Sequence, residues 1–132
     1  MIANGWFDVK LTPLPPDERP ECAMLGTMLI EKQFHDDLEA TSAGRMLTAG
    51  TDVKGSAGYV AIERVSGKLH GRNGSFILQH SGTLARGTPQ QSITVVPDSG
   101  AGELTGLVGT MLIIIADGKH FYRFDYTLPE SS

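Results

Sequence analysis

The stretch YVAIERVSGKLHGRNGSFILQHSGT, residues 59–83, decides the fold of this chain. On both sides of Asn73-Gly74 the sequence alternates apolar and polar residues, which is typical of two antiparallel strands joined by a two-residue turn. Asparagine and glycine adopt positive φ readily, so this pair is the expected turn. The expected cross-strand pairs are Arg72 with Ser75, Leu69 with Leu78, and Gly67 with His80.

A second hairpin is expected at Asp117-Gly118, between strands at residues 107–116 and 119–128. Pairing outward from this turn places an aromatic ring over the glycine at position 109, which is a known way of covering bare backbone. The expected pairs are Ile115 with His120, Ile113 with Tyr122, Met111 with Phe124, and Gly109 with Tyr126.

Further strands are expected at residues 6–11, 24–34, 38–47 and 92–96, which gives eight in all. No window shows the long apolar pattern of period 3.6 that a helix requires, so little helix is expected. Short connections between successive strands favour an all-β fold, an eight-stranded antiparallel up-and-down barrel, because closure leaves no exposed sheet edge. A two-sheet sandwich is the competing layout.

The composition is that of one ordinary globular domain, here residues 1–132. The prolines within residues 12–22 exclude a sheet interior, so this segment is expected to be a mobile loop, and residues 129–132 a frayed tail. A net charge of -4, with 11 basic residues spread thinly, argues against a nucleic-acid partner. The longest apolar run, residues 111–116, is too short to span a bilayer, so no membrane partner is expected.

Motifs for metals, cofactors and targeting do not emerge from the sequence. The four histidines share no metal-ligand spacing, and the single cysteine, Cys22, has no partner, so no metal site is expected. Residues 100–106 superficially resemble a dinucleotide loop, but the last glycine comes one residue too late, so no cofactor is expected. The N-terminus lacks a basic region followed by an apolar stretch, which makes a cytoplasmic location the expectation.

Glu63 and His80 are the candidate catalytic residues. They lie on the more apolar face of the first hairpin, which should point inward, and they would lie diagonally on adjacent strands. A carboxylate beside an imidazole could do acid–base chemistry. The alternative is a mutually satisfied polar pair that fixes the strand register, or a Glu63 paired with an arginine across the barrel.

Three tyrosines extend this interpretation to a ligand site. Tyr59, Tyr122 and Tyr126 could surround a cavity with hydroxyl groups above an apolar lining, beside Glu63 and His80. The alternative is core packing in which each hydroxyl is bonded to a neighbour, because an eight-stranded barrel can either fill with side chains or hold one small ligand.

The reverse face of the second hairpin is unusually apolar. It carries Leu112, Ile114 and Phe121, and no helix is available to cover them. We therefore expect this face to be a contact between subunits of a homo-oligomer, with cover by a neighbouring loop as the alternative.

Several segments resemble an uncharacterised bacterial family, the domain-of-unknown-function family 3224. The matching stretches are QFHDDLE at 33–39, YVAIERVSG at 59–67, GSFILQHSG at 74–82, VVPDSG at 95–100 and GEL at 102–104. The resemblance implies an eight-stranded barrel similar to that of allene oxide cyclase, with an interior cavity and a capacity to oligomerise. It implies no established activity, and no site residue is transferred from that enzyme.

Three functions are consistent with these observations. The preferred one is a barrel that binds a small, largely apolar molecule in its lumen, without catalysis. The second is an enzyme of the cyclase or isomerase type, in which Glu63 and His80 move a proton. The third is an oligomeric scaffold with a packed core.

Overall fold

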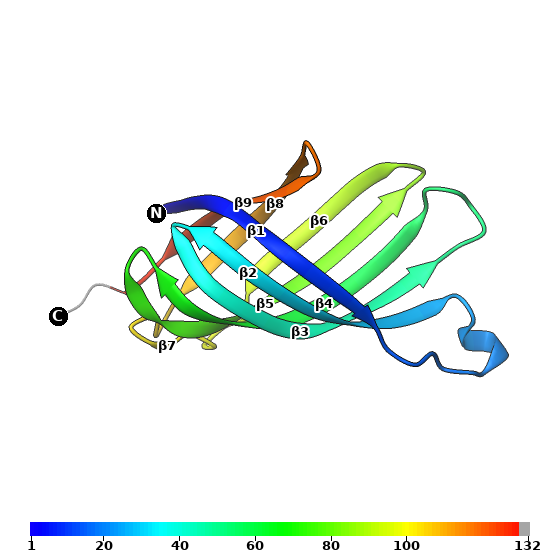
Figure 1. The fold of residues 1–132 in the computed structure, drawn as a ribbon, viewed down its shortest axis with the longest axis horizontal. Coiled ribbons are helices and arrows are strands. Elements are labelled where there is room, and N and C mark those ends of the chain that lie inside the picture. Colours follow the sequence, from blue (N-terminus) through cyan, green and yellow to red (C-terminus); the bar gives the residue numbers. More distant parts are fainter. Residues whose placement is uncertain (130–132) are drawn as a thin grey trace.

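A computed structural model describes residues 1–129 as a single antiparallel sheet that closes on itself (Figure 1). The only helical element among these residues is one 3₁₀ turn, Pro20–Cys22, and no helix there is long and apolar enough to cross a membrane. The strands are β1 (Ile2–Pro13), β2 (Leu25–Asp36), β3 (Leu38–Gly50), β4 (Ala57–Leu69), β5 (Arg72–Ala85), β6 (Thr88–Val95), β7 (Ala101–Gly102), β8 (Val108–Ala116) and β9 (Lys119–Thr127).

Eight of these strands form a closed ring in chain order. β1 pairs with both β2 and β9, and β4 pairs with β5, while the two-residue β7 adds to the edge of β5. This confirms the prediction of an all-β, eight-stranded antiparallel barrel. The weakest junction is between β6 and β8, where Thr94 and Thr110 form the one backbone pair. One side-chain bond adds to it: the Ile113 N–H donates to Gln91 Oε1 at 2.9 Å.

The turn predicted for the first hairpin is wrong. The chain turns at His70-Gly71, where both residues have positive φ, 48° and 80°, as a two-residue hairpin requires. Asn73 and Gly74 lie instead within β5, and glycine is needed at position 74 because a Cβ there would collide with the carbonyl oxygen of Ala101 in β7.

This correction changes the register but not the faces. Gly67 pairs with Gly74 rather than with His80, which pairs with Ala61. The register differs from the expected one by an even number of residues, so every side chain of the hairpin keeps its predicted face. Glu63 and His80 therefore both point inward, as predicted.

The second hairpin has the predicted turn and register. Ile115 pairs with His120, Ile113 with Tyr122, Met111 with Phe124, and Gly109 with Tyr126. The first strand is longer than predicted at both ends, and the expected loop at residues 12–22 is shorter: β1 continues through Thr12 to Pro13, whose partner is Met28. Residues 130–132 of the expected tail lie outside the described residues.

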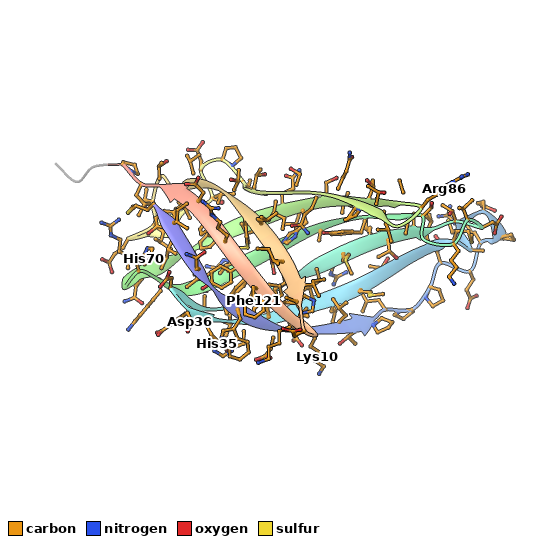
Figure 2. The ribbon with its side chains drawn as sticks, turned by 90° about the horizontal axis from the view of Figure 1, so that it is seen from above. Lys10, His35, Asp36, His70, Arg86 and Phe121 are labelled. Carbon is orange, nitrogen blue, oxygen red and sulfur yellow. The ribbon has the colours of Figure 1, made fainter. Side chains whose placement is uncertain are left out.

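The barrel has one closed end and one open end, which the turns at His70 and Arg86 mark in Figure 2. At the closed end, the inward side chains of Phe34, Leu69 and Phe124 are completely buried. At the open end, inward side chains are exposed to solvent. The side chain of Ile115, for example, is 69% exposed. This difference in exposure between the two ends arises because the strands differ in length. β8 and β9 have nine residues each, whereas β3, β4 and β5 have 13 or 14 and extend beyond them.

Candidate functional site

Four polar side chains meet inside the barrel, halfway between its ends. We call Lys32, Ser42, Glu63 and His80 the lumenal network, and all four are buried. The strand register brings them together: Lys32 pairs with Ser42 across β2 and β3, and Glu63 and His80 occupy diagonal positions on β4 and β5. Gly44 on β3 leaves the space for this arrangement, because a Cβ at position 44 would lie 2.6 Å from the Glu63 Cα.

Glu63 accepts a hydrogen bond from each of the other three residues. Its Oε1 accepts from Lys32 Nζ at 2.9 Å and from His80 Nε2 at 2.7 Å, and its Oε2 accepts from Ser42 Oγ at 2.7 Å. The predicted pairing of Glu63 with His80 is thus present. The charge that compensates Glu63 is Lys32, and not the arginine that the sequence suggested as an alternative.

These bonds keep the Glu63 carboxyl ionised. Burial raises the pKa of Glu63, but the His80 hydrogen bond, the charges of Lys32 and His80, and the Ser42 hydroxyl together lower it to about 2. A buried carboxylate costs several kcal/mol of solvation unless it is paired in this way. At neutral pH, Glu63 is therefore an anion held among three donors.

His80 and Lys32 each have hydrogen-bonding capacity left over. Because a carboxylate accepts from His80 Nε2, the neutral ring carries its proton there, and Nδ1 makes no hydrogen bond to residues 1–129. Lys32 Nζ donates to no other oxygen of this part of the chain, and lies 4.7 Å from the ring centre of Phe7 and 5.7 Å from that of Phe34. The network can thus offer one acceptor and N–H donors to a molecule that reaches it.

Between the network and the open end, the inward side chains are mostly apolar and partly exposed. Those with intermediate exposure are Val9, Met28, Met46, Tyr59 and Ile113. Methionine side chains adapt to ligands of different shape, and one tyrosine adds a hydroxyl group to the lining.

A hollow of about 450 Å³ lies at the edge of this lining, between β1 and the β8–β9 turn. We call it the rim hollow. Both inward residues, such as Phe7 and Val9, and outward residues, such as Asp8, line it, because β1 continues past the point where β9 begins. Phe7 also lies beneath the Lys32 ammonium, so one ring separates the rim hollow from the network.

The three tyrosines do not surround one cavity. Tyr122 and Tyr126 are buried at the closed end, and only Tyr59 lies towards the open end, where its ring covers Gly82. The Tyr122 hydroxyl donates to the carbonyl oxygen of His35 at 2.6 Å and accepts from the Leu38 N–H at 2.8 Å.

Each tyrosine hydroxyl keeps its proton at neutral pH. Burial raises the pKa of Tyr122 to about 12, against the backbone hydrogen bond of Leu38. Burial also raises the pKa of Tyr126, whose hydroxyl bonds to His70, and that of Tyr59. Tyr122 and Tyr126 thus match the packing alternative, in which each hydroxyl is bonded to a neighbour, because the core fills this end of the barrel.

Lys32 and Ser42 were missed from the sequence. A signal for Lys32 is present, since it alternates with Ile30 and Phe34 on the inward face of β2 and is the one charged residue among them. Ser42 has the same position between Ala40 and Gly44 on β3, but a small hydroxyl residue in a strand is too common to attract notice. No group of three potential metal ligands occurs among residues 1–129.

Taken together, the fold and the network define a closed eight-stranded barrel with a buried charged cluster in its lumen. The family model described as a protein of unknown function (DUF3224) matches residues 3–126, and the chain belongs to this family. It is similar to the crystal structure of a protein of unknown function from the DUF3224 family of Shewanella oneidensis MR-1. The two share 52% identity over 99% of this chain and 98% of that one, with a TM-score of 0.93. No curated protein matches the chain.

Proposed function

We propose that this protein binds a small, largely apolar molecule in the open half of its lumen. The observation that carries the proposal is the lumenal network, a charged cluster with unused donors beneath an apolar, partly exposed lining. Pockets for small molecules commonly combine an apolar lining with a few fixed polar groups. Glu63 holds Lys32 and His80 in place, and these two residues would contact the polar end of the ligand.

The chemistry of the network suggests what that polar end is. Lys32 offers N–H donors, while its positive charge is balanced by Glu63. A carbonyl oxygen accepts such a bond without bringing a further charge into the barrel, and burying an unbalanced charge is costly. Tyr59, near the open end, would contact the apolar part of the ligand. The proposed ligand is therefore a small carbonyl compound with an apolar body.

A thermal-shift screen with carbonyl compounds, fatty acids and terpenoids tests this proposal, because a ligand that binds only the folded state raises its melting temperature. Val9→Trp should abolish the shift by filling the rim hollow. Lys10→Trp, at the adjacent outward and exposed position, should retain it. If no compound of the three classes raises the melting temperature, and no molecule co-purifies in native mass spectrometry, the proposal of a lumenal ligand loses its support.

A second candidate function is proton transfer of the isomerase or cyclase type. The specific observation that favours it is His80, whose Nδ1 is unbonded within residues 1–129 while Glu63 orients the ring through Nε2. A base oriented by a carboxylate in this way can remove a proton next to a carbonyl group, and Lys32 could stabilise the oxygen. The proposed likeness of the barrel to that of allene oxide cyclase is compatible with such a reaction.

A nitrobenzisoxazole probe, whose ring opens when a base removes one proton, distinguishes catalysis from binding. The enzyme hypothesis predicts turnover above background that disappears in His80→Gln and falls in Glu63→Gln. Turnover that is equal in the wild type and His80→Gln would leave binding as the function of the lumen.

A further inference from the structure

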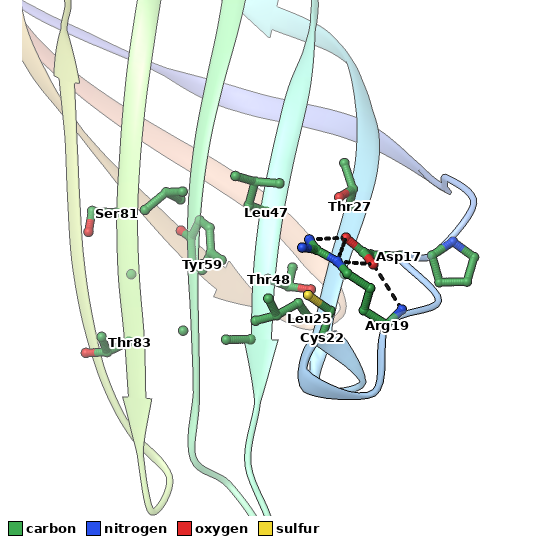
Figure 3. Close-up of a pocket in the computed structure, with 16 residues that line it drawn as sticks. Asp17, Arg19, Cys22, Leu25, Thr27, Leu47, Thr48, Tyr59, Ser81 and Thr83 are labelled. Carbon is green, nitrogen blue, oxygen red and sulfur yellow. Dashed lines mark hydrogen bonds and ion pairs between the residues drawn. The ribbon is translucent and has the colours of Figure 1, made fainter.

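A ligand-sized groove lies outside the barrel. It has a volume of about 560 Å³ and lies between the outer face of β2–β5 and the segment that connects β1 to β2 (Figure 3). We call it the outer groove. Most of its strand residues are at outward positions, and the inward Gly26, Thr48, Tyr59 and Gly82 between them also border it.

The shape of the outer groove follows from small residues at its centre. Ala49 and Gly58 form an outward pair on β3 and β4, and they lie between the larger side chains of Leu25 and Thr83. Leu47 and Val60 form the next outward pair, with 56% and 49% exposure. The result is an apolar depression in a sheet surface that is otherwise covered by side chains.

One side of the outer groove carries the exposed ion pair of Asp17 and Arg19. Arg19 donates to Asp17 through Nε, at 2.9 Å, and through Nη2, at 2.6 Å. Its Nη1 donates to no oxygen atom of residues 1–129. Ser81 and Thr83 line the opposite side (Figure 3).

We propose that the outer groove is a second ligand site, which takes a small uncharged molecule with an apolar body and one hydrogen-bond acceptor. The volume lies within the range of small-molecule pockets, roughly 300 to 1,000 Å³. The Asp17–Arg19 pair is neutral overall, so it favours an uncharged acceptor over a carboxylate, while the remaining Arg19 N–H groups supply the donor. The site does not depend on the lumenal ligand.

The dye prodan, an uncharged naphthyl ketone whose emission shifts to the blue in apolar surroundings, is the probe for this site. The wild type should bind it saturably. Gly58→Leu should weaken binding about tenfold by filling the depression. The added Cβ meets only the Gly82 carbonyl oxygen, at 3.7 Å, so the variant should fold. Arg19→Gln should weaken binding about fivefold through the lost hydrogen bond.

A matched pair of charged variants controls for surface polarity. Leu47→Glu lies in the outer groove and should abolish binding, whereas Ile62→Glu, the next outward position on β4 beyond Val60 and 54% exposed, should not. Equal binding by the wild type and Gly58→Leu would overturn the proposal, as would the absence of saturable binding. If Val9→Trp removes prodan binding and Gly58→Leu does not, the dye occupies the lumen and the outer groove is not a site.

Discussion

At the scale of single residues, the lumenal network holds the Glu63 carboxylate inside the barrel among three hydrogen-bond donors. Alternation along the first hairpin was enough for the sequence to place Glu63 and His80 inside, because the more apolar of the two faces of a hairpin is the one that packs inward. Lys32 and Ser42 come from strands whose faces were not assigned, since pairing across β2, β3 and β4 depends on the closure of the barrel. The residue that balances the Glu63 charge was therefore outside the reach of local patterns.

The first prediction concerns the coupling between Lys32 and Glu63. Glu63→Leu should lower the free energy of unfolding by about 3 to 5 kcal/mol, because it leaves the Lys32 charge buried without a partner. The double variant Lys32→Met/Glu63→Leu should lose less than the sum of the two single variants, since removing both charges leaves neither unpaired. Urea unfolding measures all three.

Glu31→Gln, on the exposed outward face of β2, is the matched control and should change stability by less than ~0.5 kcal/mol. Strict additivity of Lys32→Met and Glu63→Leu would show that the two charges do not stabilise each other.

The second prediction concerns pH. The pKa of Glu63 is about 2 in the folded protein and near the ordinary 4.5 in the unfolded chain, so the unfolded state takes up a proton first as the pH falls. The contribution to stability is complete above about pH 4.5 and is lost as the pH falls through about 2. It amounts to about 3 kcal/mol, by the usual conversion of pKa differences into free energy.

Other carboxyl groups also titrate in this range, so the comparison is between the wild type and Glu63→Gln. The difference in unfolding free energy between the two should shrink as the pH is lowered from 6 to 2. A difference that stays constant over this range would contradict the depressed pKa.

At the scale of secondary-structure elements, faces were easier to predict than registers. The second hairpin was predicted residue by residue, because Asp117-Gly118 is the one turn signal between its strands. The first hairpin contains two such signals, His70-Gly71 and Asn73-Gly74, and an even difference between the two registers leaves the alternation unchanged. The turn at His70-Gly71 leaves Gly74 within β5, where the backbone of the distant segment β7 lies against it.

The third prediction separates these two turns. Gly71→Ala should cost about 1 to 2 kcal/mol, because its φ of 80° is unfavourable for a residue with a Cβ, although nothing lies within 4 Å of that position. Asn73→Thr should cost less than ~0.5 kcal/mol, since Asn73 is exposed and extended in β5. Chemical denaturation of both variants is the measurement. The opposite ranking, with Asn73→Thr the more damaging, would restore the turn that the sequence favours.

At the scale of the whole molecule, the barrel leaves the apolar outer face of β8 and β9 uncovered. The outer side of β8 and β9 carries Leu112, Ile114 and Phe121, and Phe121 pairs with the outward Trp6 of β1. Nothing among residues 1–129 covers Leu112 or Ile114, which are 51% and 47% exposed. Figure 2 shows Phe121 on this side, over the strands nearest the viewer. The sequence identified this face from the alternation along the second hairpin.

The fourth prediction is that this outer face joins two copies of the chain. Arg123 and Asp125 follow Phe121 at the next outward positions of β9, so a two-fold contact between copies can bring opposite charges together around the apolar residues. Light scattering should give a mass above that of one chain. Ile114→Glu should reduce it to the monomer, because a buried glutamate without a partner is costly at such a contact. Ile62→Glu, on the outer face of β4, should leave it unchanged. A wild type that is monomeric at every concentration would show that this face does not join two copies of the chain.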